Sequence, residues 1–137
     1  MPHLTLDYTA NLDAAGADMR ALCTTLAATL VALRNEAGGP LFPVAGTRVM
    51  ARPAAVFAVA DGEPGRAFIY LNLLIDAGRS DAMKQRAGEA VLAAASAHLD
   101  GLFADHAIGM TVHVVEATPA WTGKRNNLAS HLEKAAS

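Results

Sequence analysis

Residues 68–81 read FIYLNLLIDAGRSD, and this stretch decides how the rest of the chain is arranged. The run from Phe68 to Ile75 is almost continuously apolar, which is typical of a strand buried on both faces. Ser80 can accept hydrogen bonds from first-turn amides, and Asp81 is favourable near the positive end of a helix dipole. The stretch therefore predicts a central strand, a tight turn and the start of a helix.

The same order of elements is expected on both sides of this stretch. An alanine-rich helix body continues to about residue 102, and the alternation over 108–115 predicts a last strand. Upstream, alternate apolar positions over 3–9 predict a strand that begins almost at residue 2. Apolar residues at three- and four-residue steps then predict one long amphipathic helix over 12–33, with Asn11 as its N-cap.

Breaks in the pattern close the first half of the chain. A strand region is expected over 47–60, where Pro53 removes a ladder donor and so indicates an edge, a bend or a break. Residues 61–65 predict a turn. A short helix is expected near 127–134, in an otherwise polar tail.

The order strand, helix, strand thus occurs twice. We expect one α+β domain over residues 1–137, built from pseudo-repeats of about 1–64 and 65–137. Right-handed crossovers would give an antiparallel or mixed four-stranded sheet with both helices on one face. The other face would expose more apolar surface than soluble proteins usually tolerate, so oligomerisation is expected.

The composition limits which classes of partner the protein is expected to bind. The 137 residues carry 11 basic and 13 acidic side chains, a formal net charge of -2, so neither nucleic acid nor an anionic membrane is an expected partner. No apolar run reaches the ~18–20 residues of a membrane span, and the amino terminus lacks the pattern of an export signal. The lone Cys23 cannot form an intramolecular disulfide, which fits a cytoplasmic protein. The five histidines are scattered and the glycine-rich turns lack a phosphate-binding pattern, so no metal and no cofactor is expected.

Four motifs together resemble one known family. They are Pro2-His3 at the head of a strand, FPVAGTR at 42–48, IDAGRS at 75–80, and Asn126-Asn127 near the end. With the duplicated order of elements, the chain resembles the 5-carboxymethyl-2-hydroxymuconate isomerase family of the tautomerase superfamily over nearly its whole length. The resemblance implies a homotrimer and a cofactor-free isomerase. Its substrate would be 5-carboxymethyl-2-hydroxymuconate, a small polycarboxylate dienol of homoprotocatechuate catabolism.

The resemblance also implies which residues carry the chemistry. Pro2 would be the amino-terminal base, which requires that Met1 be removed, and arginines would bind the substrate carboxylates. Burial and a nearby cation disfavour the charged form of an amine and lower its pKa. Such an amine can therefore accept a proton near neutral pH. Arg79, just before the Ser80 cap, would bind a carboxylate, and Arg48 would polarise the 2-hydroxy or 2-oxo acid end.

Other interpretations stay open at this stage. Pro2 could be an ordinary solvent-facing terminus, and either arginine a solvated surface charge. Arg52 is a weaker third candidate that would share a strand face with Arg48, and His3 is more readily structural than catalytic. Trp121 could line a pocket or cover a subunit contact.

Two other functions fit the same fold. The first is a tautomerase that acts on a simpler 2-hydroxymuconate or a phenylpyruvate-type substrate, because substrate choice depends on the site and not on the fold. The second is a non-catalytic trimeric binding protein in which Pro2 stays blocked by Met1.

Overall fold

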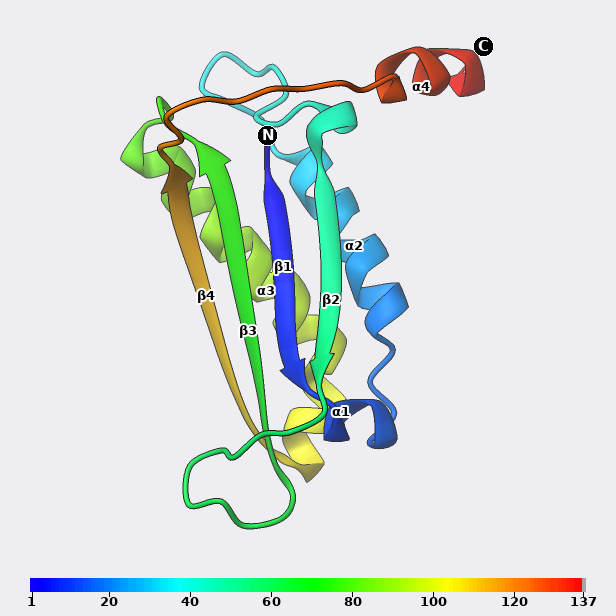
Figure 1. Ribbon diagram of the computed structural model, residues 1–137, viewed down its shortest axis with the longest axis vertical. Helices are drawn as coiled ribbons and strands as arrows, with labels where there is room; N and C mark the ends of the chain where they lie inside the picture. The colour runs from blue at the N-terminus through cyan, green and yellow to red at the C-terminus, as the bar shows by residue number, and fades with distance from the viewer. Residues whose placement is uncertain (137) are drawn as a thin grey trace.

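A computed structural model describes residues 1–136 as two β-α-β units followed by a tail (Figure 1). The units meet in a single sheet, and the tail leaves it to end in a separate helix. The elements in chain order are β1 (His3–Thr9), α1 (Asn11–Ala14), α2 (Met19–Ala32), the 3₁₀ turn η1 (Val44–Gly46), β2 (Arg48–Ala54), β3 (Arg66–Asp76), α3 (Asp81–Asp105), β4 (Ala107–Ala117) and α4 (Leu128–Ala136).

The sheet has four strands in the order β2-β1-β3-β4. Strands β1 and β2 are parallel, as are β3 and β4, while β1 and β3 run antiparallel at the centre. The sheet is therefore mixed, one of the two predicted arrangements. Because of the antiparallel centre, β1 and β2 begin at the end of the sheet where β3 and β4 finish, and the register sets His3 beside both Arg48 and Leu74.

Strand alternation builds the core. In β1 the side chains of Leu4, Leu6 and Tyr8 are buried under the helices, and their neighbours point to the opposite face. Both α2 and α3 cover this one face (Figure 1), which confirms the predicted layering. The helices contribute buried stripes at three- and four-residue steps: Met19, Leu22, Leu26 and Leu30 from α2, and Met83, Ala87, Val91, Ala95 and Leu99 from α3.

The uncovered face of the sheet is less buried than the sequence indicated for β3. Alternate β3 residues such as Phe68, Tyr70 and Leu74 lie on it and are only partly buried within a single chain. No helix of residues 1–136 packs on this side, which agrees with the prediction that one sheet face is left uncovered in a single chain.

The long helix predicted over 12–33 is wrong, because the chain forms two helices there. Gly16 adopts a positive φ of 92° between α1 and α2, a conformation that glycine reaches without strain. A second cap then starts α2, in which the Asp18 carboxylate accepts a hydrogen bond from the Ala21 amide at 3.0 Å. Asn11 is not an N-cap; it lies inside α1 and donates through its amide to the Arg66 carbonyl at 2.8 Å.

Other local predictions are confirmed. Ser80 caps α3, since its side chain accepts a hydrogen bond from the Met83 amide at 3.3 Å. Pro53 lies in the edge strand β2. The short helix predicted in the tail is α4. None of the helices within residues 1–136 is long and apolar enough to cross a membrane.

Candidate active site

The amino terminus lies at the end of the sheet where β1 and β2 begin. Pro2 is buried, and its carbonyl accepts a hydrogen bond from the Arg48 amide at 3.1 Å, which extends the parallel β1–β2 pairing to the terminus. The terminal amine, carried by Met1, donates to Asp76 Oδ2 at 2.5 Å from across the antiparallel pair. Three strands therefore hold the terminus in place.

The Arg48 guanidinium lies against the same terminus. Its Nη1 is 3.0 Å from His3 Nε2, 3.4 Å from the Gly46 carbonyl and 4.0 Å from Met1 Sδ. Because a guanidinium only donates, His3 Nε2 must accept, which requires an unprotonated nitrogen. Burial first, and then the Arg48 cation, lower the pKa of His3 and favour this neutral form. His3 thus holds Arg48 in position from the adjacent strand.

Gly46 allows η1 to approach the terminus closely. A Cβ atom at this position would lie 3.0 Å from Pro43 Cγ and 3.1 Å from Met1 Cγ, both tighter than ordinary contacts. A larger residue here would make Pro43 or Met1 shift by a few tenths of an ångström, so glycine favours the close passage of the FPVAGTR segment past the amino terminus.

Asp76 is a site residue that sequence reasoning missed. The hydrogen bond from the terminal amine lowers the pKa of the Asp76 carboxyl, so the carboxylate is ionised beside the amine at neutral pH. Asp76 was part of the IDAGRS motif, but only the strand register shows that it lies opposite the terminus. Its position at the end of a buried strand was the one available signal.

Arg79 lies at the same end of the sheet and lines a hollow that Pro2 and Arg48 do not reach. Its guanidinium donates to the carbonyls of Asp76 and Leu41, each at 3.2 Å, and its Cζ stacks 4.7 Å from the centre of the Phe42 ring. The hollow in front of it measures about 510 Å³, and neither Pro2 nor Arg48 lines it. Its lining is Asn35, Glu36, Leu41, Ala77, Gly78, Arg79, Ser80 and Met83.

This hollow already contains an anion. Ser80 Oγ donates to Glu36 Oε1 at 2.7 Å, and this hydrogen bond lowers the pKa of Glu36, so its carboxylate lies charged near the start of α3. A substrate carboxylate at Arg79 would meet this charge. The structure thus brings Pro2 and Arg48 together and links Arg79 to them through Asp76.

Arg52 shares the open sheet face with Arg48, as predicted, but it forms two hydrogen bonds with the Asp7 carboxylate at 3.0 and 3.2 Å. Trp121 is 83% exposed in the single chain, and its use in a subunit contact stays a prediction.

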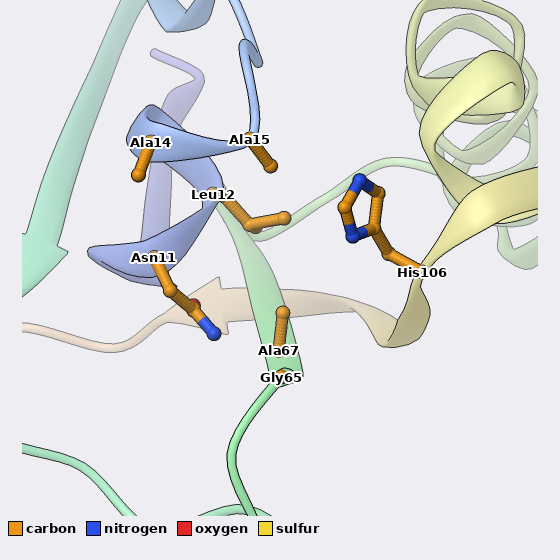
Figure 2. A pocket seen from close by; sticks show the side chains of 7 residues that line it. All are labelled: Asn11, Leu12, Ala14, Ala15, Gly65, Ala67 and His106. Carbon is orange, nitrogen blue, oxygen red and sulfur yellow. The ribbon is translucent and has the colours of Figure 1, made fainter.

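A second hollow lies at the opposite end of the sheet, and Figure 2 shows its lining. It measures about 290 Å³ and is formed mainly by small and apolar side chains, with Leu12 and His106 pointing toward one another across it. Asn11 adds an amide whose buried Oδ1 has no hydrogen-bond partner. None of the three predicted site residues lines this hollow, and neither an arginine nor a lysine is among its lining residues. Within residues 1–136, no three His, Cys, Asp or Glu side chains are grouped to hold a metal ion.

The duplicated β-α-β sheet with a proline at its head is the tautomerase fold. A solved structure described as the W0 fused 4-OT wild type symmetric trimer superimposes with a TM-score of 0.53 at 18% identity, covering 90% of this chain and 93% of its own. At that identity the likeness concerns the fold alone.

The family is defined by closer matches. Residues 2–132 match the family described as 5-carboxymethyl-2-hydroxymuconate isomerase, and the chain belongs to it and is an isomerase. A relative from Escherichia coli, 5-carboxymethyl-2-hydroxymuconate Delta-isomerase, is 28% identical over 128 residues, covering 93% of this chain and 96% of its own. A crystal structure of a 5-carboxymethyl-2-hydroxymuconate delta-isomerase superimposes with a TM-score of 0.90 at 38% identity, covering 96% of this chain and 93% of that one.

Proposed function

We propose that this isomerase converts 5-carboxymethyl-2-hydroxymuconate by moving a proton and a double bond, with the Pro2 amine as the base. The observation that carries the proposal is the placement of Pro2, which is buried at the head of β1 and bonded to the Arg48 backbone, with the Arg48 guanidinium beside the terminus. The name of the family supplies the substrate class.

The proposal requires that Met1 be removed. While Met1 is attached, the Pro2 nitrogen is an amide and has no basic lone pair. The Met1 side chain lies against Gly46 and Arg48, so its removal would leave the Pro2 amine facing both. Burial and the Arg48 cation disfavour a charged amine, whereas the Asp76 carboxylate favours it, and the balance of these effects decides whether Pro2 accepts a proton near pH 7.

The proton transfer balances within one molecule of substrate. The neutral Pro2 amine takes the proton of the dienol, the bonding electrons shift along the conjugated chain, and the resulting ammonium returns a proton to a distant carbon. The intermediate dienolate is an anion, which Arg48 would stabilise at the oxygen as charge develops. Arg79 would bind a carboxylate farther along the substrate, with its planar guanidinium already aligned by Leu41 and Phe42.

The proposal includes a homotrimer of single-domain subunits in the cytoplasm, acting in homoprotocatechuate catabolism. Support for assembly comes from the open sheet face. There Met50 is 56% exposed, Phe68 and Leu74 are partly buried, and the buried Oδ1 of Asn72 has no partner. A second subunit would cover the apolar groups and could supply the missing donor. The fused 4-OT named above is described as a trimer, which agrees with this arrangement.

A kinetic assay combined with an intact mass tests the proposal. Mass spectrometry identifies the protein that has lost Met1. This protein should consume 5-carboxymethyl-2-hydroxymuconate without added cofactor, and the decay of the dienol absorbance measures the reaction. Full activity in protein that retains Met1 would rule out the amine base. Turnover of 2-hydroxymuconate without turnover of the carboxymethyl substrate would favour the simpler tautomerase.

A further inference from the structure

The Arg48 guanidinium differs from that of Arg52, farther along the same strand, in the kind of partner that holds it. Arg52 donates two hydrogen bonds to the Asp7 carboxylate, so its charge is paired. Within residues 1–136 no carboxylate lies at salt-bridge distance from Arg48. The shortest contact of its guanidinium is with the imidazole of His3, at 3.0 Å between Nη1 and Nε2. Arg48 is therefore held by a neutral acceptor and keeps its charge for an external anion.

The strand register fixes the contact between these two side chains. His3 and Arg48 are direct partners in the parallel β1–β2 pairing, so both side chains leave the same face of the sheet. The other contacts of the guanidinium are longer: 3.4 Å to the Gly46 carbonyl and 4.0 Å to Met1 Sδ, which is lost when Met1 is removed. In the processed chain, His3 is therefore the main group that orients the Arg48 guanidinium.

The contact depends on the protonation state of His3. A guanidinium only donates, so Nε2 can accept only while it carries no proton. Protonation turns this acceptor into a donor and sets a second cation beside the guanidinium, which repels it. The imidazolium form of His3 and the hydrogen bond from Arg48 therefore exclude one another.

The charges that act on His3 come from several parts of the chain. Burial has the largest effect and lowers the pKa of His3. The charges of Arg48 in β2, of the terminal amine and of Lys124 in the tail lower this pKa further, and Asp76 of β3 raises it. The net pKa lies below the ordinary histidine value of 6.5, so His3 is neutral at neutral pH and is protonated in acid. After processing, the terminal amine is that of Pro2, whose ammonium form would act in the same direction.

We propose that His3 is the positioning residue of Arg48, and that Arg48 stabilises the dienolate intermediate only while His3 is neutral. The imidazole fixes the guanidinium without neutralising it, whereas a carboxylate partner such as Asp7 would compete with the anionic intermediate. In acid, protonation of His3 releases the guanidinium, and the stabilisation is lost by a route separate from the Pro2 amine. This inference rests on the proposed function through the role assigned to Arg48.

Two variants of the assembled enzyme without Met1 separate the hydrogen bond from the ring. His3→Leu removes the acceptor, so kcat at pH 8 should fall by about tenfold with a smaller change in KM, since part of the Arg48 contribution is lost. His3→Gln offers an amide oxygen at a similar reach and should stay within about threefold of wild type. Because His3 acts through Arg48, His3→Leu should cause no further loss in an Arg48→Gln background. A full additional loss in that background would overturn the proposal.

The pH dependence provides a measurement that a merely structural His3 would not change. The ratio of kcat/KM in wild type to that in His3→Gln cancels the titration of the Pro2 amine, which both enzymes share. This ratio should be constant above neutral pH and should fall by up to about tenfold as the pH drops below about 6.5, since only wild type protonates at position 3. His113 is bonded to Tyr70 at 2.7 Å on the same sheet face, and the ratio for His113→Gln should not change with pH. A constant ratio for His3→Gln down to pH 5 would contradict the proposal.

An NMR titration of the same enzyme tests the contact without turnover. At pH 8 the ¹⁵N shift of His3 Nε2 should be that of an unprotonated nitrogen, and the pKa of His3 should rise in Arg48→Gln, because loss of a cation favours the imidazolium. If both results are obtained and wild type is inactive, the proposed function fails while His3 stands as the positioning residue of Arg48. Normal turnover with a protonated Nε2, or with an unchanged pKa of His3 in Arg48→Gln, would refute the role of His3 and leave the proposed function intact.

Discussion

The two β-α-β units begin at opposite ends of the sheet, but only the first unit sets an arginine, Arg48, beside the amino terminus. His3 pairs with Arg48 where the first unit begins, and Arg66 pairs with Ala107 where the second begins. Gly65 thus takes the place of Pro2 in the second unit, in mid-chain, where no free amine can form. The end with Pro2 carries Arg48, Asp76 and Arg79, whereas no arginine, lysine or carboxylate lines the hollow at the far end.

This difference shows that concavity alone does not mark the site in this fold. The far hollow is well formed and its lining includes the imidazole of His106, but it holds no arginine and no lysine. The proposed reaction requires a cation as well as a base, since an anionic intermediate must be formed and stabilised. Under the proposed mechanism, duplication of the fold does not duplicate the chemistry, because β3 of the second unit follows Gly65 in mid-chain and offers no terminal amine.

The largest expected effect comes from Pro2→Ala at the charged end. An alanine amine is primary and lacks the rigid ring, so kcat/KM should fall by about 10³-fold, within the range for loss of a general base. Stopped-flow or steady-state assays at pH 7 measure this, with intact masses that confirm Met1 removal in both proteins. Equal rates in wild type and Pro2→Ala would show that the Pro2 amine is not the base, and the two ends of the sheet would then no longer differ in this respect.

Arg48→Gln should have the next largest effect. Loss of the cation that stabilises the dienolate should lower kcat by about 10²-fold, as for the removal of one oxyanion donor. Arg52→Gln is the matched control on the same strand and face, since its guanidinium is paired with Asp7. A comparable loss of kcat in Arg52→Gln would show that strand charge in general, and not Arg48 in particular, supports the reaction.

Arg79→Gln should raise KM by about tenfold with a smaller change in kcat, because the proposed role is to bind a carboxylate away from the reacting oxygen. Steady-state kinetics with the carboxymethyl substrate separates the two parameters. Glu36→Gln provides a second measurement, since loss of the competing carboxylate in the same hollow should lower KM. If KM is unchanged in both variants, the hollow at Arg79 lies outside the site.

Asp76→Asn should shift the pH dependence and change the maximum rate only modestly. Asp76 accepts from the Met1 amine, and we propose that it lies near the Pro2 amine once Met1 is removed and stabilises its ammonium form. Removal of the Asp76 charge should therefore let the Pro2 amine lose its proton at a lower pH. The acidic limb of kcat/KM should therefore move down by about half a pH unit, given the exposure of the carboxylate. Asp7→Asn, farther along β1, should leave the profile in place. A shift toward higher pH in Asp76→Asn would contradict the assigned contact.

The smallest effect on activity is expected at the far end. Asn11→Ala removes the hydrogen bond to the Arg66 carbonyl, which should cost about 1 kcal/mol and lower Tm by about 4 °C. We expect kcat/KM to stay within about twofold of wild type, because a general stability change away from the reacting atoms leaves transition-state binding intact. Thermal unfolding and the standard assay measure both quantities. A tenfold loss of activity without a change in Tm would mean that the far hollow also takes part in the reaction.

Much of the fold could be predicted from local patterns. Strand alternation over 3–9 and the apolar run after residue 68 depend only on near neighbours, as does the Ser80 cap, and all three are confirmed. The prediction of a single first helix was wrong because the apolar spacing continues through residues 15–18. In the structure, the positive φ of Gly16 and the Asp18 cap divide this stretch into two helices. A cap inside a periodic stretch competes with the helix, and periodicity alone cannot show which one prevails.

For the site, the sequence by itself determined the types of residue: a proline ahead of a strand and arginines beside glycine-bearing turns. Only the tertiary structure decided their neighbours. It set Asp76 against the terminal amine, Arg52 against Asp7 and Arg79 against Phe42, and it packed α4 of the tail on η1. The physical reason is distance along the chain. Strand register and the path of the tail join residues that are tens of positions apart, and no local periodicity encodes such contacts.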